Sequence, residues 1–236
     1  MLLVVGQIQV VGPIDAHAAI IINMFEHDFL NFPIYPRIEE NGIRYYDTPA
    51  GKFKSVTTIL GERLDKSGLE RWKARVGEDE AKKISTQASN RGTAIHEIAE
   101  KYVLNDPNYK RGIMPFNLVT FNSIKPILDK HVEKVYGIES TLYSAKLQAA
   151  GTCDMLAVFS GENTIVDYKT SKRIKKKKDI ESYFLQTAAY SWCAREMTGI
   201  DFLQIAIIMA VDHEDPILFI EKAENYYDRM LEVFCR

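Results

Sequence analysis

Apolar runs in the second half of the chain predict a β-sheet. Such runs cover residues 137–148, 152–159, 164–169, 203–211 and 217–220. The runs at 152–159 and 164–169 are apolar on both faces, which is typical of strands in the middle of a sheet. Residues 34–60 have the pattern of short strands and turns, and Ser55 is a candidate N-cap for a helix that begins near Val56.

Helical periodicity predicts the remaining elements at residues 66–104, 116–135, 179–198 and 223–234. Gly77 and Gly92 are candidate breaks in the first of these, and Pro126 is a candidate kink in the second. The order of elements predicts an α/β fold in which a mixed central β-sheet carries helices on its faces. We expect an N-terminal extension with short strands at 1–54 and one domain at 55–236, with a helical part at 55–135, a sheet core at 136–222 and a final helix at 223–236.

Composition narrows the function classes without naming one. The 236 residues are 46% hydrophobic and 26% charged, an ordinary globular profile, and the formal net charge is −2. A nucleic-acid partner would therefore need a local basic patch. Cys153, Cys193 and Cys235 are far apart and form no CxxC, so we expect no zinc site, iron–sulfur cluster or disulfide framework.

The first 23 residues are apolar but interrupted, and they contain neither Lys nor Arg. They are too broken to predict a membrane span, and they lack the basic residues of a signal or transit peptide. We interpret them as an added strand or as a misassigned start with Met24 as the initiator; targeting is the less favoured alternative. The expected location is cytoplasmic, in the host cell if the protein is viral, with no membrane partner.

Candidate chemistry lies in the stretch GTCDMLAVFSGENTIVDYKTS, residues 151–171. It has the pattern of a buried hairpin, yet it contains Asp154, Asp167 and Lys169. With a turn centred between residues 161 and 162, Asp154 lies opposite Lys169 and diagonal to Asp167, and all three share a face. Two buried carboxylates repel each other unless a cation lies between them, and Mg²⁺ prefers such oxygen ligands. From spacing alone, a structural Asp–Lys salt bridge remains an equal alternative.

The segments around this hairpin resemble a known family. SVTTIL, ERWKARVGEDEA, RGTAIHEIAEKY, GIESTLYS, AAGTCDMLAV and LQTAAY are similar, in this order, to segments of PD-(D/E)xK nucleases of the RecB-like branch. The similarity is greatest to the mitochondrial genome maintenance exonucleases and their phage relatives, and it runs from Ser55 to the last helix. It implies a restriction-endonuclease-like fold with an N-terminal helical extension that arches over the site.

The resemblance also implies roles for individual residues. Asp154, Asp167 and Lys169 match the catalytic group. Mg²⁺ or Mn²⁺ would be held by both aspartates, by the Tyr168 backbone carbonyl and by His96. The family pattern further matches Gln186 and Tyr190 as substrate-binding residues and Glu139 as a supporting residue, and Glu100, one turn after His96, could orient its ring. Taken alone, His96 is more typical of a core histidine, and Gln186 with Tyr190 of an ordinary helix surface.

A basic run follows the last of these strands. Seven of the ten residues from 169 to 178 are Lys or Arg, and Lys172 and Arg173 are placed to bind a nucleic-acid backbone. A solvated loop is the alternative.

Together these features predict a metal-dependent DNA exonuclease that acts on single strands from free ends, in replication, repair, recombination or phage DNA processing. The alternatives are a structure-selective endonuclease of the same fold and a non-catalytic nucleic-acid-binding module.

Overall fold

The structure is a computed structural model that describes residues 25–235, and its strands form one nine-stranded mixed sheet. Residues 1–23, for which we expect an added strand or a misassigned start, lie outside the described residues. The strands are β1 (Glu26–His27), β2 (Arg37–Glu40), β3 (Ile43–Thr48), β4 (Gly51–Ser55), β5 (Val132–Ser144), β6 (Ala149–Phe159), β7 (Glu162–Ser171), β8 (Gln204–Val211) and β9 (Ile217–Lys222). They follow the order β2-β3-β4-β6-β7-β8-β9, and β5 pairs with β6 and β1. The pairs β1–β5, β4–β6 and β7–β8 are parallel and the others are antiparallel, as a mixed sheet requires.

Most helices follow the predicted periodicity, but the helix expected to reach residue 135 ends at His131, and β5 begins at Val132. The helices are α1 (Val56–Arg63), α2 (Ser67–Val76), α3 (Glu78–Val103), α4 (Pro115–His131), α5 (Glu181–Thr198) and α6 (Glu224–Phe234), with a 3₁₀ turn at Lys177–Asp179. Ser55 caps α1 as expected, because its Oγ accepts a hydrogen bond of 3.0 Å from the Thr58 amide. Gly77 separates α2 from α3 with φ +84°, whereas the break expected at Gly92 is wrong, since α3 continues through it. Pro126 lies inside α4.

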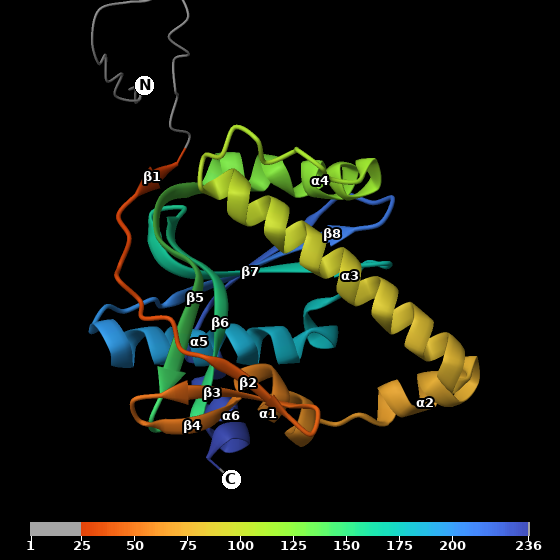
Figure 1. Cartoon of the computed structure of the whole chain (residues 1–236), viewed down its shortest axis with the longest axis horizontal. Coiled ribbons are helices and arrows are strands. Elements are labelled where there is room, and N and C mark those ends of the chain that lie inside the picture. The colour runs from red at the N-terminus through yellow and green to blue at the C-terminus, as the bar shows by residue number, and fades with distance from the viewer. Residues whose placement is uncertain (1–24, 236) are drawn as a thin grey trace, which may run out of the picture.

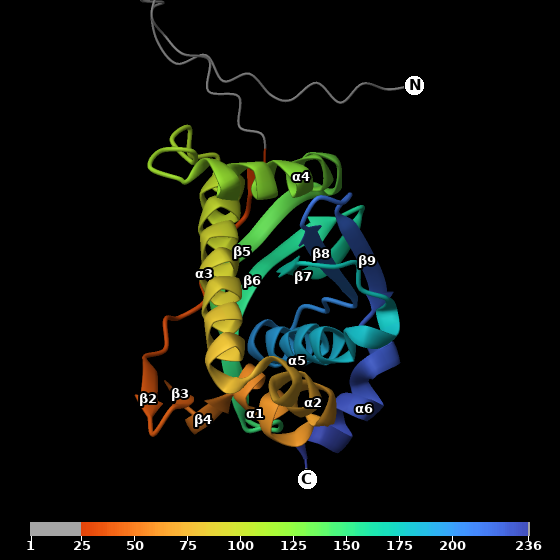
Figure 2. The ribbon, with the colours of Figure 1, turned by 90° about the vertical axis from the view of Figure 1, so that its right-hand side faces the viewer.

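Helices cover both faces of the sheet, as the α/β prediction requires (Figures 1 and 2). On one face, α3 and α4 bury residues such as Ile95 and Phe121 against Met155 and Val166 of the sheet. On the other face, residues of α1, α5 and α6 pack against Leu156, Ile165, Ile205 and Ile207. In Figure 1, α3 runs diagonally across the front of the strands, and this path brings its middle to the end of β7.

The register of the β6–β7 hairpin corrects the sequence-based alignment. Phe159 pairs with Glu162, so the loop contains only Ser160 and Gly161, both with positive φ (54° and 83°). This is the geometry of a two-residue hairpin loop. Continuing the pairing past Met155 and Val166 places Asp154 level with Asp167, and Lys169 becomes the diagonal neighbour. The expectation that Asp154 lies opposite Lys169 is therefore wrong, while the shared face of the two aspartates survives, because the shift preserves alternation.

The segment before α1 joins the same sheet. Strands β2 and β3 form an antiparallel hairpin, and β4 pairs with the start of β6 at Lys54–Ala149 and Ser55–Ala150. The boundary between an extension and a nuclease domain near residue 55 stays a prediction. Within residues 25–235, the helices are too short or too polar to cross a membrane.

Candidate active site

Three carboxylates lie side by side on neighbouring strands. In the β5–β6 register, Ile138 pairs with Met155 and Ser140 with Cys153, which places Glu139 level with Asp154. Asp154 is in turn level with Asp167 on β7. Glu139 has φ +45°, a left-handed backbone conformation that is uncommon outside glycine. Such local strain within a strand often marks a functional position.

Asp154 takes a hydrogen bond from the neighbouring strand. Its Oδ2 accepts a hydrogen bond of 2.7 Å from the Tyr168 amide, and the residue is only 7% exposed. The carboxylate therefore has a fixed orientation, with Oδ1 turned toward α3.

His96 reaches this cluster from α3. Its Nε2 lies 2.9 Å from the Tyr168 carbonyl oxygen, and its Nδ1 lies 3.4 Å from Asp154 Oδ1 and 3.9 Å from Glu139 Oε1. These three neighbours account for the orientation of the ring. Glu100 is not among these neighbours of the ring nitrogens, and its expected orienting role stays a prediction.

The local charges shift the pKa values of both His96 and Asp154. Burial opposes ionisation of each, but it is outweighed by their hydrogen bond and by mutual attraction. The pKa of His96 rises to about 10, with Glu139 contributing, and the pKa of Asp154 falls below its ordinary value. At neutral pH His96 is therefore protonated, and its positive charge partly balances the acidic cluster.

Asp167 belongs to a second, more deeply buried group. It is 1% exposed, its Oδ1 accepts 2.9 Å from Gln186 Nε2 on α5, and its Oδ2 forms an ion pair with Lys169 Nζ. Burial and the charge of Asp154 raise the pKa of Asp167 to about 6, against the opposing effect of Lys169. The same two carboxylates overcome the desolvation of Lys169 and raise its pKa, so the ammonium stays charged.

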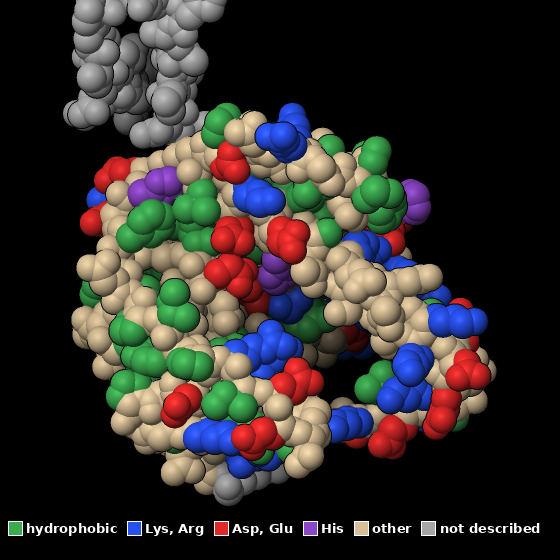
Figure 3. All heavy atoms as spheres, in the orientation of Figure 1, with side chains coloured by type: hydrophobic (Ala, Val, Ile, Leu, Met, Phe, Trp, Pro, Cys, Tyr) green, Lys and Arg blue, Asp and Glu red, His purple; other side chains and the backbone are tan. Residues whose placement is uncertain are grey.

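Most of these residues line one cavity of about 440 Å³, but the predicted metal ligands Asp167 and Tyr168 are not part of its lining. Figure 3 shows histidine, acidic and basic side chains together in the hollow at the centre of this face. Among the residues expected to act, His96, Glu139, Asp154, Lys169, Gln186 and Tyr190 line the cavity. Glu100 lines an adjoining hollow with His96 and Glu139, whereas Lys172 and Arg173 are exposed on the loop after β7 and do not line the cavity.

Sequence reasoning missed another part of the cavity wall. That wall includes Arg37, Arg44, Tyr46, Ser55, Thr57 and Thr152. Arg37, Arg44 and Tyr46 come from β2 and β3, more than a hundred residues before Asp154, and no spacing in the chain links them to it. Tyr46 could have been noticed only as an aromatic residue in a short strand, a pattern that equally fits simple packing.

The acidic cluster has the donor set of a divalent-cation site. One ligand atom each from His96, Glu139 and Asp154 lies within 4.8 Å of the other two. Within residues 25–235, this is the one cluster of three or more His, Cys, Asp or Glu side chains that are close enough to share a metal ion. The buried Oδ2 of Asp167, by contrast, is already engaged by the Lys169 ammonium. Two or three carboxylates with one imidazole fit Mg²⁺ or Mn²⁺, and the nitrogen ligand suits Mn²⁺ better.

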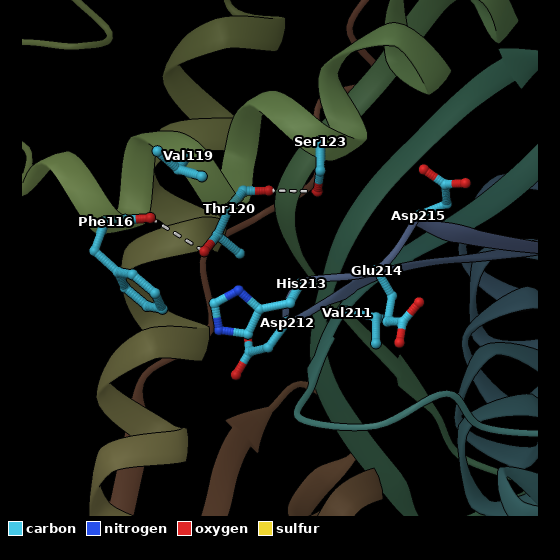
Figure 4. Close-up of a pocket in the computed structure, with 9 residues that line it drawn as sticks. All are labelled: Phe116, Val119, Thr120, Ser123, Val211, Asp212, His213, Glu214 and Asp215. Carbon is cyan, nitrogen blue, oxygen red and sulfur yellow. Dashed lines mark hydrogen bonds between the residues drawn. The ribbon is translucent and has the colours of Figure 1, made fainter.

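A separate cavity of about 490 Å³ between α4 and the turn after β8 is lined by Asp212, His213, Glu214 and Asp215, but within residues 25–235 these side chains do not converge as the groups at His96 do (Figure 4). Its helix hydroxyls are already engaged, because Thr120 Oγ1 donates to the Phe116 carbonyl and Ser123 Oγ donates to the Thr120 carbonyl. Asp212 on its floor is paired with Arg91 of α3. We therefore place the candidate active site at the carboxylate cluster.

Comparison with known proteins identifies relatives of this chain. No protein-family model matches the chain. "Mitochondrial genome maintenance exonuclease 1" of Homo sapiens is 30% identical over 174 residues, which cover 68% of this chain and 49% of that protein. The chain is homologous to mitochondrial genome maintenance exonuclease 1. The protein of this name in Mus musculus is 27% identical over 160 residues, covering 61% of this chain and 47% of its own length. The chain thus spans about half the length of the curated relatives it matches.

Among solved structures, the "Putative exonuclease" of Eubacterium rectale matches with a TM-score of 0.36 and 18% identity, over 61% of this chain and 68% of that one. The resemblance noted from the sequence is confirmed by the homology to mitochondrial genome maintenance exonuclease 1.

Proposed function

We propose that this protein is a metal-dependent exonuclease that hydrolyses phosphodiester bonds in single-stranded DNA from free ends. The observation that carries the proposal is the assembly of His96, Glu139, Asp154 and Lys169 around one cavity, with Asp167 paired to Lys169, in a chain homologous to a protein named an exonuclease. Homology to an exonuclease supports a nucleic-acid substrate, and the cavity supplies the chemistry that phosphate transfer needs.

The acidic residues would hold the cofactor, Mg²⁺ or Mn²⁺, through Asp154, Asp167, His96 and the Tyr168 carbonyl, with Glu139 in support. When bound, the ion supplies Lewis acidity to the phosphate and lowers the pKa of water. The protein's own part begins with position: the Tyr168 amide fixes Asp154, and Gln186 fixes Asp167. A preorganised arrangement of this kind costs no rearrangement when the reaction occurs.

Lys169 has the charge and location of a transition-state stabiliser. It stays protonated beside Asp167 and lines the cavity, so its ammonium can face the developing charge on the non-bridging phosphate oxygens. Attack of water in line with the leaving 3′ oxygen gives 5′-phosphorylated products. No side chain needs to form a covalent bond, and Cys153 is buried in the core against α5 rather than in the cavity.

The helical segment before the site supports the proposed preference for single strands. Figure 3 shows an opening between the body of the protein and the part that contains α2 and the start of α3. Exposed basic residues Arg71, Lys73 and Arg75 of α2 lie along this part. We propose that α2 and α3 arch over the strand, that Tyr190, Lys172 and Arg173 bind it, and that a free end enters through the opening.

Digestion of end-labelled single strands tests the proposal. Linear and circular oligonucleotides are incubated with Mg²⁺, Mn²⁺ or EDTA, using the wild type, Asp154→Ala and the matched exposed control Asp228→Ala. We expect metal-dependent digestion of linear DNA only, lost in Asp154→Ala and retained in Asp228→Ala. Cutting of circles would instead indicate an endonuclease, and binding without digestion would indicate a non-catalytic module.

A further inference from the structure

Two arginines from the N-terminal hairpin stand in the wall of the proposed active site. Arg37 pairs with Tyr46 across β2 and β3, and Arg44 lies two residues before Tyr46 on β3. Because paired residues and residues two apart share a face of a strand, both guanidinium groups lie on the face that carries Tyr46. Both line the same cavity as Asp154 and Lys169.

The hairpin is attached to the catalytic strand at this point. Tyr46 is 3% exposed, and its hydroxyl lies 3.1 Å from the hydroxyl of Thr152 on β6. Thr152 is two residues before Asp154 and lines the same cavity. The position of the arginines is therefore fixed relative to the carboxylates, rather than left to a loose terminal segment.

The positive charge of these arginines is poorly neutralised. Among residues 25–235, Arg44 has no carboxylate within 4.0 Å, and Arg37 has only Glu39 at 3.9 Å, with both side chains more than half exposed. An exposed ion pair at that distance contributes little free energy, so it leaves the Arg37 charge available to another anion. The lining of the cavity thus combines an acidic cluster that attracts a cation with two guanidinium groups, of which only Arg37 has an ion pair, the distant one with Glu39.

We propose that Arg37 and Arg44 bind a phosphate of the DNA strand next to the one that is cleaved. The guanidinium group matches phosphate with two parallel hydrogen bonds, which makes arginine suited to this anion. The proposed mechanism puts the scissile phosphate at the carboxylates and Lys169, and we assign to the arginines a neighbouring phosphate of the same backbone. This binding would draw the strand into the cavity and set which bond reaches Lys169. The inference rests on the proposed nuclease function.

The test combines variants of the protein with neutral linkages in the DNA. Single-stranded oligonucleotides that carry one methylphosphonate at successive positions are digested by the wild type, Arg37→Gln, Arg44→Gln and the double variant. Arg111→Gln, an exposed arginine in the loop after α3, is the matched control, and Arg37→Lys with Arg44→Lys retains charge without the fork. Thermal melting of each variant checks that it folds.

We expect KM to rise about tenfold for each Gln variant, with little change in kcat, because a charge-assisted hydrogen bond is lost from binding. The Lys variant should lie between the wild type and the double Gln variant, and Arg111→Gln should match the wild type. The slope of log binding constant against log salt concentration should fall by about 0.7 for each arginine removed. One methylphosphonate position should weaken the wild type but leave the double variant unaffected.

Two results would overturn the inference in different ways. If the wild type digests DNA while the double Gln variant retains its KM, salt slope and methylphosphonate profile, the arginines do not bind phosphate and the nuclease function stands. If the wild type neither binds nor digests any of the oligonucleotides, the proposed function fails and this inference fails with it.

Discussion

Gly151 lies against Tyr190 in the wall of the candidate site, and its replacement by alanine tests whether this wall is rigid. Gly151 lies on β6, three residues before Asp154. A Cβ atom there would lie 2.7 Å from Tyr190 Oη, 3.0 Å from Cε1 and 3.3 Å from Cζ. Tyr190 is 3% exposed, on a helix packed against the sheet, so its ring has little room to retreat.

The expected cost follows from these overlaps. Inserting a methyl group into a well-packed core costs about 1–3 kcal/mol. We therefore expect Gly151→Ala to lower the free energy of unfolding by about 2 kcal/mol. A protein of this size loses about 2–4 °C in Tm per kcal/mol, so the Tm should fall by about 4–8 °C.

Thermal and urea unfolding of four proteins measure the effect: the wild type, Gly151→Ala, Tyr190→Phe and the double variant. Tyr190→Phe removes the atom at 2.7 Å but leaves the ring carbons at 3.0 and 3.3 Å. The double variant should therefore recover part of the loss, with a coupling energy of about 0.5–1 kcal/mol. Gly61→Ala in α1, where a Cβ would meet nothing within 4 Å, is the control and should raise stability by up to about 1 kcal/mol. Wild-type stability of Gly151→Ala beside a normal control would refute the reasoning.

Three further outcomes follow from the site. Asp154→Asn should lower Mn²⁺ affinity by about 100-fold or more, measured by titration calorimetry, while the protein still folds because the amide oxygen can accept from the Tyr168 N–H; equal affinity would remove Asp154 from the ligand set. Since the pKa of His96 is raised to about 10, the ring is charged at pH 7.5 and must lose its proton to bind metal, so binding should release about one proton, and affinity should rise with pH up to about 10; heats that do not depend on the ionisation enthalpy of the buffer would contradict this. Arg91→Met should cost about 1–3 kcal/mol in urea unfolding, because it leaves Asp212 without a partner that lies 2.5 Å away with both side chains mostly buried; a change below about 0.5 kcal/mol would show that the pair is not stabilising.

Local patterns in the chain predict much of this architecture. Ser55 and Gly77 act through their immediate neighbours, so the start of α1 and the end of α2 follow from the sequence. The strands around Asp154 and Asp167 follow from uninterrupted apolar runs, which have few other ways to be buried. The prediction of the register was wrong because Ser160 adopts a positive φ that serine rarely adopts, so the sequence favoured a turn one residue later.

The rest of the cavity depends on contacts between distant segments. Arg37, Arg44 and Tyr46 reach the site because β4 pairs with β6, and only two residue pairs make this connection. Neither periodicity nor spacing encodes such a pairing across about a hundred residues. The contact of Gln186 with Asp167 is the opposite case, because the resemblance to the nuclease family placed that residue beside the site and the structure brings the two side chains to 2.9 Å.

The backbone pairing of β6 with β7 ends at Met155 and Val166. Asp154, the next residue, is therefore a structural link between the two strands as well as a candidate ligand. Beyond that point a carboxylate, and not a main-chain oxygen, joins the two halves of the sheet through the Tyr168 amide. The exchange rate of the Tyr168 amide hydrogen with deuterium therefore reports how often the hydrogen bond between Asp154 and β7 opens. Any event that draws the carboxylate toward an incoming cation should be visible there before a single bond in DNA is cut.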